Sequence, residues 1–96
     1  MYRVEQTAEF ARWLKGVRDE RAQQRIAQRI FRLQGGNRGD WKSVGGGVSE
    51  MRIDHGPGYR LYYAMRGRVV ILLLCGSVKS DQDKAIGLAK EMARSN

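Results

Sequence analysis

The segment from residue 50 to residue 63 constrains the fold of this 96-residue chain more than any other part of its sequence. Polar and apolar residues alternate on both sides of Gly56-Pro57-Gly58, which has the composition of a turn between two strands. In the second strand one face carries Arg60 and Tyr62, and the other carries Tyr59, Leu61, Tyr63 and Met65. The polar face of the first strand carries Glu50, Arg52 and Asp54. We therefore expect two strands with one apolar face and one mostly cationic face that can bind an anion.

The charge balance also indicates an anionic partner. The chain contains 18 Lys and Arg residues against 10 Asp and Glu residues, which gives a formal net charge of +8. Most of these cations are arginine, whose guanidinium group binds phosphate through paired hydrogen bonds and stacks on bases. The composition favours nucleic acid or an acidic protein as the partner; the alternative is a basic surface without a partner.

Chain length and cysteine content narrow the class of protein further. Residues 1–96 are enough for a single domain with one core. Cys75 is the only cysteine, which excludes an internal disulfide and a cysteine-based zinc site, and its apolar run is too short to span a bilayer. The N-terminus carries no hydrophobic signal region. We expect a cytoplasmic protein that uses no metal or other cofactor and does not bind membranes.

The first third of the chain predicts a strand and two helices. Residues 2–6 alternate like a short strand. Thr7 is suited to cap a first helix that ends near Val17, and Asp19 is suited to cap a second helix that ends near Leu33. Both helices carry an apolar stripe, so together they should form a helical hairpin that covers one face of a sheet.

The rest of the chain predicts an antiparallel sheet and one more helix. A short strand is expected at 41–44, before the two strands described above. The strand at 68–75 is apolar on both faces and should be central in the sheet. Ser80-x-x-Asp83 predicts the start of the last helix. The expected fold is α+β, with the order β-α-α-β-β-β-β-α, a twisted antiparallel sheet, an N-terminal helical hairpin and a C-terminal helix.

Four arginines recur at helical spacing on one side of the second helix: Arg21, Arg25, Arg29 and Arg32. Four like charges on one stripe repel one another unless an anion lies nearby. This stripe is therefore either a binding surface for an acidic protein or a phosphate backbone, or a solvated face.

The residue types that common enzymes use are scarce. His55 is the only histidine, and a single histidine in a turn is expected to be an exposed polar residue. Glu50 and Asp54 flank Arg52 on one strand face, so we interpret them as charge partners of that arginine. The chain offers no Ser-His-Asp set and no cluster of metal ligands.

A cationic cluster remains as the candidate for chemistry. It would contain Arg52, Arg60 and Lys79, with Tyr62 beside them. Such a cluster can act on RNA without a metal, because the 2′-hydroxyl of RNA is an internal nucleophile next to its own 3′-phosphate. Arginine supplies charge but no base. Neighbouring cations are expected to lower the pKa of Lys79 and of a tyrosine, which would suit either of them for proton transfer.

Several motifs in the chain resemble those of the RelE/ParE toxin superfamily, nearly from end to end. The motifs are Phe10-x-x-Trp13-Leu14, Gly39-Asp40, Glu50-x-Arg52-Ile53, Gly56-Pro57-Gly58-Tyr59-Arg60-Leu61-Tyr62-Tyr63, Leu72-Leu73-Leu74 and Gly76-x-x-Lys79-Ser80-x-Gln82. The greatest similarity is to the HigB-like branch, the addiction-module killer proteins.

The resemblance implies the toxin of a type II toxin–antitoxin pair that cuts mRNA in the ribosomal A site. It implies that Arg60 contacts the scissile phosphate, that Arg52 is the basic residue of the preceding strand, and that Lys79 assists the leaving group. Glu50 stands where RelE carries a further lysine. Other residues expected to contact RNA are Lys42, His55, Tyr59 and Gln82. The implied partner is a small helix-turn-helix antitoxin, through which operator DNA would be bound.

Two other functions are compatible with these patterns. A ParE-like inhibitor of DNA gyrase would have the same fold without a cationic active site. An inactive interaction module would bind an antitoxin, with the arginine stripe on the second helix contacting its acidic segments.

Overall fold

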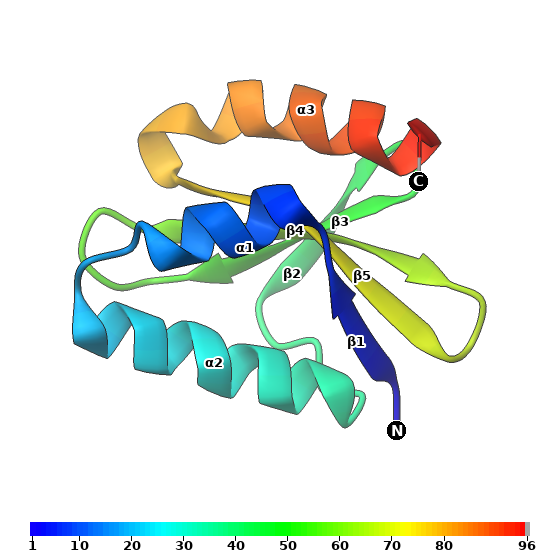
Figure 1. Cartoon of the computed structure of the whole chain (residues 1–96), viewed down its shortest axis with the longest axis horizontal. Helices are drawn as coiled ribbons and strands as arrows, with labels where there is room; N and C mark the ends of the chain where they lie inside the picture. Colours follow the sequence, from blue (N-terminus) through cyan, green and yellow to red (C-terminus); the bar gives the residue numbers. More distant parts are fainter. Residues whose placement is uncertain (96) are drawn as a thin grey trace.

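A five-stranded sheet with strand order β1-β5-β4-β3-β2 forms the middle layer of the fold in this computed structural model, which describes residues 1–95 (Figure 1). The strands are β1 (Arg3–Gln6), β2 (Trp41–Gly45), β3 (Val48–Ile53), β4 (Tyr59–Arg66) and β5 (Val70–Val78). The helices are α1 (Ala8–Lys15), α2 (Glu20–Gln34) and α3 (Gln82–Ser95), and the 3-10 helix η1 (Lys79–Asp81) leads into α3. This order confirms the predicted α+β arrangement.

Side-chain caps start the first two helices where the sequence predicts them. The hydroxyl of Thr7 accepts a hydrogen bond from the Phe10 amide at 3.0 Å and donates one to the Leu74 carbonyl at 2.6 Å. The carboxylate of Asp19 accepts hydrogen bonds from the Arg21 and Ala22 amides at the start of α2. Each cap satisfies amides that would otherwise lack partners in the first helical turn. Thr7 also fastens α1 to β5.

Hydrophobic cores lie on both faces of the sheet. The first core joins α1 and α2 to one face and includes Phe10, Ile26, Leu33, Met51, Leu61 and Tyr63. The second core joins α3 to the other face and includes Val48, Tyr62, Leu74, Cys75, Ala85 and Ala89. Figure 1 shows α3 and α2 at opposite ends of the view, with the strands crossing between them. Both faces of β5 are therefore covered, as its continuous apolar sequence predicts.

Two predictions about the strands need correction. β1 pairs with β5 in parallel, from Arg3 with Val70 to Gln6 with Leu73, whereas the other pairs are antiparallel, so the sheet is mixed. The alternation of a short strand says nothing about the direction of its partner. β5 also continues past Cys75 to Val78, and the last α-helix begins at Gln82 because η1 occupies the residues before it.

No helix within residues 1–95 is both long enough and apolar enough to cross a membrane.

The contact between α1 and β5 gives a sharp stability prediction at Gly76. A Cβ atom at this position would overlap the indole ring of Trp13, whereas a Cβ atom at Gly87 in α3 would contact nothing within 4 Å. Gly76→Ala should lower the free energy of unfolding by about 1–3 kcal/mol, because the ring has to move out of its site. Gly87→Ala should raise it by about 0.5–1 kcal/mol, because alanine favours a helix. Urea unfolding of both variants tests this, and equal effects would contradict the packing described.

Candidate functional site

Arg52 and Arg60 are directly opposite each other on β3 and β4, on the face of the sheet that α3 covers. Arg60 is only 8% exposed, and its Nη1 donates to the carbonyl of Tyr59 at 3.2 Å. Its Nε is buried and has no hydrogen-bond partner within residues 1–95. A buried guanidinium nitrogen without an acceptor is costly and is suited to receive an oxygen from a ligand.

Lys79 lies next to Arg60 because of the glycine at position 58. The Lys79 amide donates to the Gly58 carbonyl at 2.8 Å, and Gly58 has a φ of +79° that favours glycine. A Cβ atom built on Gly58 would lie 3.2 Å from the Cβ of Lys79 and 3.7 Å from Nη1 of Arg60. The structure thus brings Arg52, Arg60 and Lys79 together from three separate segments. We call these three residues the cationic cluster.

Glu50 lies beside the cationic cluster and is fully buried. Its Oε1 accepts from Nε of Arg52 at 3.2 Å, and its Oε2 accepts from the Tyr62 hydroxyl at 3.1 Å and from Nε2 of Gln82 at 2.8 Å. The ion pair with Arg52 confirms the predicted charge pairing for Glu50. The same prediction is wrong for Asp54, which follows the end of β3, is exposed and makes no ion pair with Arg52 within residues 1–95. The expected open polar face is wrong at Glu50, because α3 packs over it.

The hydrogen bonds decide the charge of Glu50. Burial alone would raise the pKa of its carboxyl group, but the donors Gln82, Arg52 and Tyr62 outweigh burial, and the pKa lies below its usual value. Glu50 is therefore an ionised acceptor whose oxygens are already engaged.

Tyr62 is a neutral donor in this site. Burial, reinforced by the neighbouring Glu50, raises the pKa of its hydroxyl well above the usual value of 10. The expectation that nearby cations would lower the pKa of a tyrosine is wrong for Tyr62, since its hydroxyl faces an anion and lies out of water. Its place is in the second core, where its ring is fully buried.

The four further residues predicted to contact RNA separate into two groups. Lys42 is exposed on β2, opposite Glu50, and Gln82 donates to Glu50, so both lie at Glu50 beside the cationic cluster. Tyr59 is on the other face of the sheet, 6% exposed, with its ring 6.3 Å from the ring of Trp13. His55 contacts the cap of α2. These last two side chains therefore do not join the cationic cluster.

The contact of His55 also corrects its expected exposure. Its Nε2 lies 3.0 Å from Oδ2 of Asp19, and the imidazole is only 20% exposed. This hydrogen bond holds the pKa of Asp19 below its usual range. His55 therefore ties the turn between β3 and β4 to the start of α2.

The arginine stripe of α2 lies on the opposite side of the sheet from the cationic cluster. Arg21, Arg25 and Arg32 are exposed, and they line two shallow hollows with Gln24 and Gln28. Arg29 differs, because its Nη1 donates to the carbonyl of Arg52 at 2.7 Å. Three members of the stripe are thus exposed and can bind a partner, whereas Arg29 is hydrogen-bonded to β3 and holds α2 against the strand that carries Arg52.

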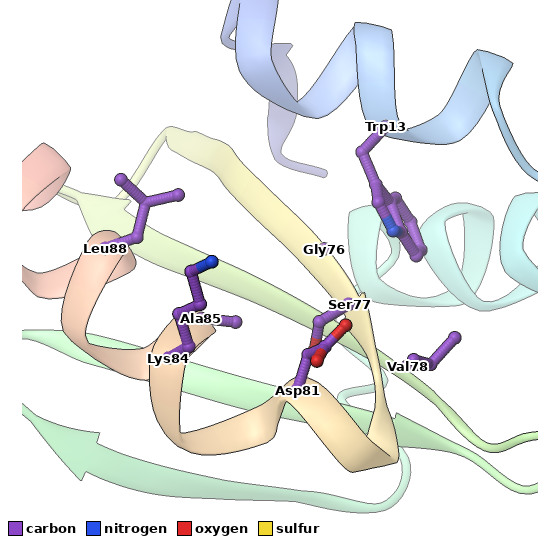
Figure 2. A pocket seen from close by; sticks show the side chains of 8 residues that line it. All are labelled: Trp13, Gly76, Ser77, Val78, Asp81, Lys84, Ala85 and Leu88. Carbon is purple, nitrogen blue, oxygen red and sulfur yellow. The ribbon is translucent and has the colours of Figure 1, made fainter.

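Ser77 is a site residue that the sequence did not reveal. It pairs with Arg60 across β4 and β5, is 6% exposed, and its hydroxyl lies close to the hydroxyl of Tyr62. It also lines a groove between α1 and α3, in which Figure 2 shows Trp13 on one side and Leu88 on the other. Ser77 lies beyond the predicted end of its strand, so the alternation could not assign it to a face.

Residues 1–95 contain no group of three or more His, Cys, Asp and Glu side chains that could hold a metal ion. Cys75 is buried, and burial raises the pKa of its thiol to about 12, so it is a core residue rather than a nucleophile.

The chain belongs to the same family as an uncharacterized protein of Haemophilus influenzae. The two are 47% identical over 91 residues, which cover 95% of this chain and 92% of the relative. No protein-family model matches the chain. The family relationship thus covers the whole fold and names no activity.

The lowered pKa of Glu50 predicts how stability changes with pH. A carboxyl group whose pKa is lower in the folded state stabilises the protein above its unfolded pKa, and this contribution is lost as the pH falls through the folded pKa. Glu50→Gln should therefore lower the free energy of unfolding by about 1–3 kcal/mol at neutral pH. The difference from wild type should shrink below the usual pKa of 4.5.

Urea unfolding at several pH values measures this difference. Glu91→Gln, at an exposed position of α3, is the control and should show no such pH dependence. A difference between wild type and Glu50→Gln that stays constant on acidification would contradict the ionised state assigned to Glu50.

Proposed function

We propose that this protein is an endoribonuclease that cuts mRNA on the ribosome and is the toxin of a type II toxin–antitoxin pair. The observation that carries the proposal is the convergence of Arg52, Arg60 and Lys79 at one end of the sheet. Arg60 presents a buried nitrogen without an acceptor, and Lys79 is exposed beside it. This arrangement suits a phosphate group with the rest of a nucleic acid lying outside. The resemblance to RelE/ParE toxins supports the same activity.

The chemistry needs only groups that the RNA, the cationic cluster and solvent water supply. The 2′-hydroxyl of the RNA gives its proton to solvent water while its oxygen forms a bond to the phosphorus, the bond from phosphorus to the 5′-oxygen breaks, and a second proton reaches the departing 5′-oxygen. The products are a 2′,3′-cyclic phosphate and a 5′-hydroxyl end. Arg60 and Arg52 would neutralise the extra negative charge of the phosphorane, and Lys79 would donate the proton to the leaving oxygen.

The proposal also assigns the partners. A small helix-turn-helix antitoxin would neutralise the toxin and bring it to operator DNA. Three exposed arginines of α2, Arg21, Arg25 and Arg32, suit acidic segments of such an antitoxin or a phosphate backbone.

Substitution within the cationic cluster tests the activity. Arg60→Ala and Lys79→Ala should each reduce mRNA cleavage in a purified translation reaction by about 10²–10³-fold, because each removes one group that stabilises charge in the transition state. Lys79 is exposed, so its replacement should leave the fold intact, and the unfolding curve of Arg60→Ala shows whether that variant folds. Arg68→Ala, at an exposed position between β4 and β5, is the matched control and should cut like wild type.

A second substitution, in the substrate, tests the reaction type. A 2′-deoxynucleotide on the 5′ side of the cut should block cleavage at that bond and leave other sites unaffected. Cleavage that continues at the deoxy position would contradict attack by the 2′-hydroxyl.

Inhibition of gyrase supercoiling without ribosomes would replace the proposal with a ParE-like function, and expression without growth arrest would favour an interaction module.

A further inference from the structure

Three segments of the chain meet at a single buried carboxylate. Glu50 is fully buried in β3 and accepts hydrogen bonds from Arg52 on the same strand, Tyr62 on β4 and Gln82 at the start of α3. Arg52 belongs to the cationic cluster, Tyr62 lies two residues from Arg60 in the chain, and Gln82 lies three residues from Lys79. Glu50 itself is out of reach of solvent and of a bulky substrate.

The bond to Arg52 fixes that side chain in a useful orientation. It engages Nε of Arg52 at 3.2 Å, and the arginine remains 37% exposed. Because Glu50 engages Nε, the two terminal nitrogens of Arg52 are left to bind two oxygens of one phosphate.

The other two bonds act on the segments that carry Arg60 and Lys79. Tyr62 is two residues from Arg60 and lies on the same face of β4, so its bond to Glu50 fixes the face from which Arg60 projects. Gln82 follows η1, which begins at Lys79, and its 2.8 Å bond to Glu50 fixes the junction of η1 and α3 against β3.

We propose that Glu50 is a positioning residue that sets the three members of the cationic cluster in one geometry for the reaction, an inference that rests on the proposed function. A carboxylate offers two oxygens to three donors, whereas an amide offers one oxygen and an opposing NH₂ group. An anion beneath three cations weakens the attraction of an RNA phosphate, so Glu50 acts through geometry and against binding affinity.

This combination predicts opposite changes in binding and in cleavage. Glu50→Gln removes the negative charge and the preferred hydrogen bonds at nearly constant volume. The variant should bind a fully 2′-deoxy version of a substrate oligonucleotide as tightly as wild type or up to about tenfold more tightly at low salt. Its single-turnover cleavage of mRNA on saturating ribosome complexes should fall by about 10–10²-fold, because small displacements of catalytic groups are expensive.

Two further variants separate positioning from general stability. Gln82→Ala should reduce single-turnover cleavage less than Glu50→Gln does, and the double variant should cut no more slowly than Glu50→Gln alone, since both changes break one network. Glu91→Gln, in the exposed part of α3, should match wild type in binding and cleavage. All measurements are made at a temperature at which the unfolding curves show every variant to be folded.

The outcomes are distinct. Tight binding of the uncut oligonucleotide with slow cleavage by folded Glu50→Gln supports the positioning role. Cleavage at the wild-type rate by that variant overturns it, and so does a parallel loss of binding and cleavage, which would mark a purely structural residue. If wild-type protein cuts no RNA on ribosomes, the proposed function itself fails, and the positioning role fails with it.

Discussion

The arrangement of this protein depends on the burial of one carboxylate beneath α3. Glu50 is enclosed by Arg52, Tyr62 and Gln82, so the cost of removing its charge from water is offset by three hydrogen bonds, one of them from a cation. If one donor were removed, fewer hydrogen bonds would offset the free energy needed to take the Glu50 charge out of water. The network therefore fixes the position of α3 relative to β3 and β4. These elements carry or adjoin the members of the cationic cluster, so the network sets the geometry of the cluster.

The cationic residues of the chain form two separate surfaces, one on each side of the sheet. The cationic cluster lies on the α3 side, whereas the exposed arginines of α2 lie on the other side. Arg29 connects them, because its bond to the Arg52 carbonyl holds α2 against β3. A protein with two separate cationic surfaces can contact its substrate with one and a partner with the other, which suits a toxin that acts on a large particle and is neutralised by an acidic partner.

Local patterns predicted much of the fold, because short-range physics determines those features. Thr7 and Asp19 cap helices through their own neighbours, and the alternation around Gly56-Pro57-Gly58 assigned Arg60 and Tyr62 to one face. Long-range packing determines what was missed. The parallel pairing of β1, the burial of Glu50 and the place of Ser77 all depend on segments far away in the chain. Tyr62 is a neutral donor because its hydroxyl is buried beside Glu50, and neither condition is visible in the local pattern.

The central claim is that the cationic cluster cuts translated mRNA, and the positions of RNA ends in cells test it most directly. We expect a short pulse of expression to produce new 5′ ends inside coding regions with a three-nucleotide period, because the ribosome presents one codon at a time. The same pulse of folded Lys79→Ala should leave far fewer such ends. Growth arrest with transcripts that stay intact would contradict the account.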